Sequence, residues 1–151
     1  MLSYILIDAD TDPTISVGGI LDSIGGNIRV GKSEYFVTEA CEYTNSYHAF
    51  KPFISIILNV DADHLDFFKD IDEIAESFHV FATKTPKEGL VIVNGDMKYY
   101  DTVVRDLECR VVTFGKGAQN KYSAHNIRFD DFGHPTYTPV SYTHLTLPTI
   151  A

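Results

Sequence analysis

The sequence predicts an α/β fold in which helices flank a mostly parallel sheet. Strand-like and helix-like apolar periods alternate along the chain, over residues 53–60, 70–82, 90–93, 99–107 and 111–114. The run at 53–60, FISIILNV, is nearly continuous in apolar residues, as expected for a parallel strand buried on both faces. Beyond Gly117, two short alternating segments at 123–130 and 136–138 predict an antiparallel hairpin at the C-terminal end.

The first forty residues carry weaker and more local signals. Residues 1–9 predict a short helix, or the last turns of one. Residues 14–17 predict a β-branched strand that stops at Gly18-Gly19. A glycine-rich stretch at 25–31 then leads to an apolar strand at 35–38.

Both predicted helices of the later part carry one apolar stripe. In residues 70–82 the apolar side chains fall at three- and four-residue intervals, and Tyr99, Val103 and Leu107 repeat that spacing. Because each helix lies between two strands, the order predicts crossover connections of a parallel sheet.

The composition excludes several classes of function. At 151 residues the chain has room for one domain, and its formal net charge of −9 argues against a sequence-independent grip on nucleic acid. No apolar run approaches the roughly 20 residues that span a bilayer. Residues 1–10 lack the basic region and cleavage site of a signal peptide. We therefore expect a cytoplasmic location, without nucleic-acid or membrane partners.

Acidic side chains follow two of the predicted strands. The two groups are Glu39-Ala40-Cys41-Glu42 and Asp61-Ala62-Asp63-His64-Leu65-Asp66. Ligands of open α/β sheets bind beyond the carboxyl ends of the strands, so both groups lie where a site is expected. Carboxylates gathered there repel one another unless a cation neutralises them, and Mg²⁺ takes one or two carboxylates plus substrate phosphates. Acidic residues also cap helices, which is the role we expect of Asp70 and Asp72.

Several motifs in a fixed order give the sequence a resemblance to a known family. They are Gly18-Gly19, the element Gly25-x-Asn27-x-Arg29-x-Gly31, the segment Val37-x-Glu39-Ala40-x-Glu42, and Asn59 with Asp63-His64-x-Asp66. Segments 93–96 and 112–115 continue the likeness. Over residues 1–138 the chain resembles the central, P-loop-NTPase-like domain of Mur ligases, in the branch that joins L-alanine to UDP-N-acetylmuramate.

The resemblance implies an amide-forming ligase of peptidoglycan synthesis. Such enzymes phosphorylate the carboxylate of UDP-N-acetylmuramate with ATP, and L-alanine then displaces phosphate. Mg²⁺ supplies charge neutralisation for this phosphoryl transfer. By match to the motifs, Glu39 and His64 would be the catalytic metal ligands, Glu39 for the magnesium that bridges the ATP phosphates and His64 for a second magnesium.

The same match suggests roles for four further residues. Asn59 and Asp63 would support the cofactor site, and Asn27 and Arg29 would face the UDP-sugar. One position departs from the family, because Cys41 stands where Asp is common.

The larger departures concern what the chain lacks. The Walker A pattern, which ends in Lys-Ser/Thr, is absent, so we expect residues 1–138 to be a partial central domain without its phosphate loop and without useful ATP affinity. The N-terminal and C-terminal domains of the family are missing too, so the fragment alone is expected to be inactive. Residues 139–151 follow no structural pattern and resemble a translated sequencing-adapter or vector tail.

Three alternatives remain open. Another Mur ligase, or a folylpolyglutamate synthetase relative, would share the D-H-x-D segment. A non-catalytic binding module could have kept the sheet and lost the phosphate loop. A metal-dependent hydrolase could use Asp61, Asp63, His64 and Asp66, and it would act without ATP.

Overall fold

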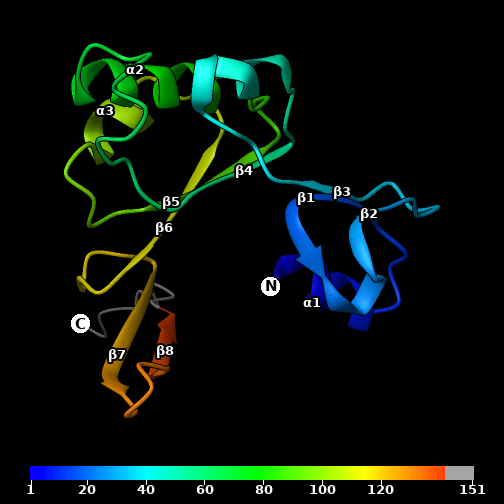
Figure 1. The fold of residues 1–151 in the computed structure, drawn as a ribbon. Coiled ribbons are helices and arrows are strands. Elements are labelled where there is room, and N and C mark those ends of the chain that lie inside the picture. The colour runs from blue at the N-terminus through cyan, green and yellow to red at the C-terminus, as the bar shows by residue number, and fades with distance from the viewer. Residues whose placement is uncertain (142–151) are drawn as a thin grey trace, which may run out of the picture. The chain divides into compact units, whose positions relative to one another are not determined.

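The computed structural model describes residues 1–141 and divides into two compact units, Met1–Cys41 and the part that begins at Glu42. Each unit has its own sheet (Figure 1): three strands in the order β2-β1-β3 in the first, and five in the order β4-β5-β6-β7-β8 in the second. No helix in the described part is both long and apolar enough to cross a membrane.

The first unit is built around one long strand. Its elements are α1 (Leu2–Asp8), β1 (Thr14–Leu21), η1 (Asp22–Ile24), β2 (Gly26–Arg29) and β3 (Phe36–Thr38). β1 pairs antiparallel with β2 and parallel with β3. The prediction that this strand stops at Gly18-Gly19 was wrong, because β1 runs through both glycines to reach its hairpin with β2. Gly25, at φ +65°, makes the turn in a conformation that glycine adopts without strain.

The second unit confirms the predicted α/β fold. Its elements are η2 (Tyr43–Ala49), β4 (Ile54–Ile57), α2 (Ile71–Ala82), β5 (Leu90–Asn94), α3 (Tyr100–Val104), β6 (Arg110–Gly115), β7 (Tyr122–Phe129) and β8 (Pro135–Ser141). Strands β4 to β7 are mutually parallel, and β8 returns antiparallel to β7. The predicted C-terminal hairpin is therefore the β7–β8 pair.

Helix α2 begins directly after its N-cap residue. Asp70 is the N-cap, and its carboxylate accepts a hydrogen bond from the Glu73 amide at 3.0 Å, which confirms the capping role expected from the sequence. The apolar stripe is buried at Ile74, Ala75 and Phe81. α3 lies beside α2 (Figure 1), so the two helices form one layer.

Only one face of β4 is buried among the described residues. Ser55 and Ile57 are buried, and the Ser55 hydroxyl lies 2.7 Å from the hydroxyl of Thr85, just beyond α2. Ile54 and Ile56 point the other way and are 52% and 45% exposed. The expectation that this strand is buried on both faces was therefore wrong for the part of the chain that the structure describes.

The expected tail at 139–151 falls mostly outside the described residues. Pro139 to Ser141 are the last residues of β8, with Val140 opposite Ser123 and Ser141 opposite Tyr122. From residue 142 onward nothing is described, so the foreign origin of the tail stays a prediction.

Candidate functional site

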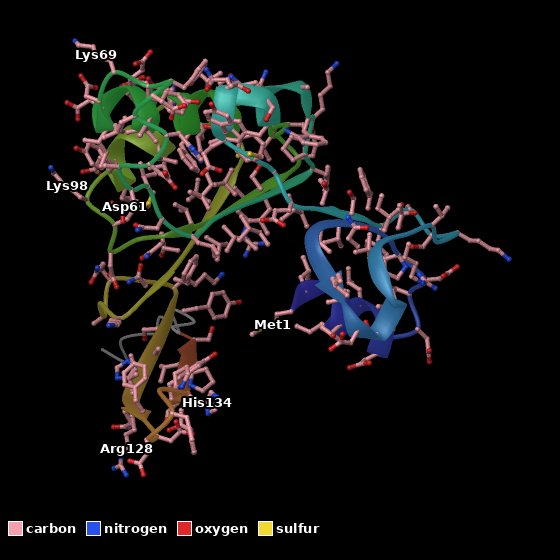
Figure 2. All side chains as sticks on the ribbon, viewed as in Figure 1. Met1, Asp61, Lys69, Lys98, Arg128 and His134 are labelled. Atoms are coloured by element: carbon pink, nitrogen blue, oxygen red, sulfur yellow. The ribbon has the colours of Figure 1, made fainter. Side chains whose placement is uncertain are left out.

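The loop that follows β4 carries the second acidic group. Figure 2 marks Asp61 where this loop leaves the sheet, and Lys69 near its end with its side chain directed away from the protein. The carbonyl of His64 accepts hydrogen bonds from the amides of Phe67 and Phe68 at 2.9 and 3.0 Å, and the buried Phe68 ring anchors the loop. His64 itself has φ +53°, a left-handed conformation that costs a non-glycine residue energy.

This loop brings His64 to two carboxylates. The Nε2 atom of His64 lies 3.4 Å from Oε1 of Glu42, and its Nδ1 atom lies 3.8 Å from Oδ1 of Asp63. Possible ligand atoms of the three residues all lie within 4.8 Å of one another. Two carboxylate oxygens and an imidazole form a donor set that Mg²⁺ or Mn²⁺ can use, so these residues fit the expected metal.

Tyr43 holds the His64 ring from one side. The two ring centroids are 4.7 Å apart, with their planes tilted by 36°. The Tyr43 hydroxyl donates to Oδ2 of Asp66 at 2.9 Å, and this hydrogen bond to a carboxylate raises the pKa of Tyr43. Asp66 is thereby engaged with Tyr43 and does not belong to the group around His64.

The structure thus brings together part of the predicted site in the second unit. Asp63 and His64 meet, as their adjacency in sequence suggests, whereas Asn59 is exposed and outside the group. Glu42 and Tyr43 are additions that the sequence reasoning missed. Glu42 could have been found, because it closes the Val37-x-Glu39-Ala40-x-Glu42 segment, but the pattern did not show which glutamate faces the histidine.

The other predicted residues lie in the first unit. Glu39 follows β3, and its Oε2 atom accepts a hydrogen bond from the Gly18 amide at 2.7 Å. Arg29 donates to Oδ1 of Asp12 at 2.5 Å and to the Pro13 carbonyl at 2.7 Å, so it fastens β2 to the segment before β1. The hydrogen bond from Arg29 lowers the pKa of Asp12.

Asn27 is exposed on β2, on the same side of the strand as Arg29. The catalytic and binding roles expected of these four residues, and of those in the second unit, stay predictions.

A second polar cluster lies at the carboxyl ends of β5 and β6. Asp96 accepts hydrogen bonds from the amides of Lys116 and Gly117 and from the side chains of Gln119 and Asn120. It borders a pocket of about 620 Å³, lined also by Phe114, Tyr122, Ser123 and Tyr137. The Asp96 carboxylate already accepts from the Lys116 and Gly117 amides. The glycine-containing loop after β6 therefore does not present these two amides to a phosphate. Sequence reasoning used residues 93–96 as part of the family likeness and gave Asp96 no role of its own.

Desolvation and hydrogen bonding act in opposite directions on Asp96. Partial burial is the largest single influence and raises its pKa, but the hydrogen bonds from Lys116, Asn120, Gly117 and Gln119 together hold the pKa below the ordinary value of 3.8. The carboxylate is therefore charged under neutral conditions, and it joins the turn after β5 to the loop after β6.

Comparison with known proteins places these features in context. Residues 21–149 match the Mur ligase middle domain family. The UDP-N-acetylmuramate–L-alanine ligase of Lachnospira eligens is 55% identical over 139 residues, which cover 91% of this chain and 30% of that protein. The chain thus spans about 30% of the length of the curated relatives it matches.

Two solved structures share the fold. The UDP-N-acetylmuramate:L-alanyl-gamma-D-glutamyl-meso-diaminopimelate ligase of Neisseria meningitides gives a TM-score of 0.74 at 24% identity, over 93% of this chain and 47% of that one. The UDP-N-acetylmuramate-alanine ligase of Thermotoga maritima gives 0.68 at 24% identity, over 83% of this chain and 27% of that one. At this identity the likeness establishes the architecture and leaves the chemistry to the residues.

Proposed function

This chain belongs to the Mur ligase middle domain family, and we propose that it forms part of a cytoplasmic, ATP-dependent ligase that joins L-alanine to UDP-N-acetylmuramate in peptidoglycan synthesis. One observation carries the proposal. A chain that is 55% identical to such a ligase gathers Glu42, Asp63 and His64 beyond the carboxyl end of a parallel sheet. That is the position where open α/β sheets bind their ligands.

The proposal includes two metal sites, one formed by residues of each unit. His64 would hold one Mg²⁺ with Glu42 and Asp63 beside it, and Glu39 would hold a second Mg²⁺ that accompanies ATP. When bound, Mg²⁺ neutralises negative charge on the phosphates and on the phosphoryl group in transfer. Asn59 would support the cofactor site through its exposed amide.

The surroundings of His64 suit a metal ligand. Either ring nitrogen has a carboxylate neighbour, Glu42 at Nε2 and Asp63 at Nδ1. Both carboxylates lie beyond ordinary hydrogen-bond distance of the ring nitrogens, so they are placed to share a cation with the imidazole. Tyr43 restricts the ring further by lying against it.

Contact with the UDP-sugar is proposed for Asn27 and Arg29. Asn27 offers an exposed amide on β2. Arg29 would contribute the part of its guanidinium that Asp12 and the Pro13 carbonyl leave open.

Nucleotide binding is the test of this proposal. The sequence has no Walker A segment, so we expect ATP binding to need the phosphate loop that the family resemblance places ahead of Met1. Calorimetry with ATP and Mg²⁺ is performed on this chain and on a version lengthened upstream by the corresponding residues of the Lachnospira ligase. Binding by the lengthened version alone is expected. Tight binding by the chain as it stands would contradict the proposal and favour an independent nucleotide-binding or metal-binding module.

Two variants of the lengthened version test the metal role. Glu39→Gln should weaken the Mg²⁺-dependent part of ATP binding, while Glu34→Gln removes the same charge from an exposed residue of the same unit and should leave it unchanged. Equal effects of the two variants would rule out a specific role for Glu39. Phosphate release by a full-length relative given UDP-N-acetylmuramate and different amino acids then tests the preference for L-alanine.

A further inference from the structure

We propose that Gly18 is a positioning residue, which fixes one carboxylate oxygen of Glu39 and leaves the other open to a divalent cation. The inference rests on the proposed metal role of Glu39 and deepens it by naming the residue that orients this side chain. Both residues belong to the first unit, in which β1 and β3 lie side by side.

The hydrogen bonds at the end of β3 show how the carboxylate is held. The parallel ladder between β1 and β3 ends with the Glu39 amide donating to the Ser16 carbonyl at 3.0 Å. In a regular parallel ladder the next donor, the Gly18 amide, would reach the main-chain carbonyl of Glu39. That carbonyl instead accepts from the Thr38 hydroxyl at 3.1 Å, and the Gly18 amide donates to Oε2 of Glu39 at 2.7 Å. The Glu39 side chain therefore takes the place of its own main chain in the ladder.

The two carboxylate oxygens of Glu39 have different surroundings in this arrangement. Oε2 is engaged by the main chain of β1, while the Glu39 side chain remains exposed. A carboxylate fixed through one oxygen loses less conformational freedom when the other binds a cation, which raises its affinity as a ligand.

The hydrogen bond between the Gly18 amide and Glu39 also requires that residue 18 has no side chain. A Cβ atom built there would lie 2.9 Å from Oε2 of Glu39, closer than real Cβ atoms approach an oxygen. The Glu39 carboxylate is the far end of a flexible side chain, so it would move away and the backbone would stay in place. Gly18→Ala should therefore displace the carboxylate at little cost in folding stability.

Gly19 supplies a matched control. It lies in the same strand, and a Cβ atom built there meets nothing within 4 Å. Neither glycine has a positive φ, so alanine is free of backbone strain at both positions. The two alanine variants differ in the contact with Glu39.

The experiment is an Mn²⁺ titration of the full 151-residue chain, followed by NMR. Bound Mn²⁺ broadens the amide signals around it. The Ala40 amide lies close to both Glu39 and Glu42, so the titration is repeated in a background with Asp63→Asn and His64→Asn, which weaken the group around His64 and leave Ala40 to report on Glu39. The Ala62 amide reports on the group around His64. Gly18→Ala should raise the Mn²⁺ concentration needed to broaden the Ala40 signal by roughly 10-fold, the lower end of the loss seen when a group that orients a metal ligand is removed. Gly19→Ala should leave it unchanged, and broadening at Ala62 should be the same in all variants.

A second variant keeps the test decisive if Gly18→Ala folds poorly. Glu39→Asp preserves the charge but withdraws the carboxylate from the Gly18 amide by one methylene, and it should cause a similar loss. Urea midpoints of all variants are compared with the Mn²⁺ affinities, because a purely structural role would change the midpoint and leave the affinity alone.

Two results would overturn the proposal. One is an unchanged Mn²⁺ response at Ala40 in both Gly18→Ala and Glu39→Asp. The other is no broadening at Ala40 in the unaltered chain, which would also remove the metal role of Glu39. ATP binding by the lengthened chain still decides the proposed ligase function separately in that case.

Discussion

Replacing Asp96 by alanine is the perturbation whose consequence the structure defines most sharply. The carboxylate accepts hydrogen bonds from two main-chain amides, of Lys116 and Gly117, and from the side chains of Gln119 and Asn120. It therefore closes the loop after β6 onto the turn after β5. Asp96→Ala removes this connection without touching either strand.

Burial decides the size of the effect. Four hydrogen bonds to a charged group, at about 1.5 kcal/mol or more each, would suggest a loss above about 6 kcal/mol. The bonds from Lys116, Gly117 and Gln119 are exposed, however, and water can replace them. Asn120 is 1% exposed, so the loss of its acceptor costs more: its side-chain amide keeps the hydrogen bond to the Gly117 carbonyl but loses the one to Asp96. We expect a destabilisation of about 2 kcal/mol, most of it from this one group.

The pH dependence follows from the lowered pKa of Asp96. A carboxylate whose pKa is lower in the folded state contributes stability that is fully present above its unfolded value, here 3.8, and is lost as the pH falls through the folded value. The difference in stability between the unaltered chain and Asp96→Ala should therefore be constant near neutral pH. It should shrink below about pH 4.

Urea unfolding at pH 7 measures the prediction, with the slope of the transition checked for constancy. Asp131→Ala is the control, because it removes the same charge from an exposed residue beyond β7. A shift of the urea midpoint no larger than that of Asp131→Ala would refute the reasoning. So would a difference that persists unchanged to pH 3.

Three further predictions concern the second unit. Asp70→Ala removes the cap that the Glu73 amide uses and should lower the free energy of unfolding by about 1 kcal/mol, measured in urea. Burial raises the pKa of Tyr47 to about 12, so its neutral form stabilises the fold below pH 10, and this contribution is lost between pH 10 and 12. Absorbance at 295 nm should show a late-titrating phenol that the Tyr47→Phe variant lacks. Ile56→Lys places a charge on the open face of β4 and should reduce light scattering at high protein concentration, with little change in the urea midpoint.

The sequence predicted the order and type of the elements because local periods carry that information. The run at 53–60 was correctly identified as a strand, but an apolar run does not reveal what covers each face, and Ile54 and Ile56 are exposed among the described residues. Gly18-Gly19 was expected to end a strand, and pairing of β1 with β2 overrides that local preference. In both cases the missing information lies in distant parts of the chain.

Contacts in the candidate site and around Asp96 also differ in whether the sequence alone could predict them. Asp63 and His64 are neighbours in sequence, so their meeting needed no knowledge of the fold. The four partners of Asp96 follow it by 20 or more residues, and only the parallel pairing of β5 with β6 brings them to it. A pattern search along the chain can find the first kind of contact and has no access to the second.

The two glutamates of the E-A-x-E segment make this difference concrete. Glu39 and Glu42 are three residues apart and chemically identical, and the sequence offered no ground for pairing either with the histidine. In the structure the main chain of β1 engages Glu39, while Glu42 lies against Nε2 of His64. The segment therefore carries one carboxylate in each unit. Glu39 accepts a hydrogen bond from the Gly18 amide, whereas Glu42 lies 3.4 Å from the His64 ring that Tyr43 contacts, so the two glutamates are not exchangeable. On the proposed metal roles, a substitution that spares both carboxylates should still weaken cation binding when it changes a neighbour such as Gly18 or Tyr43.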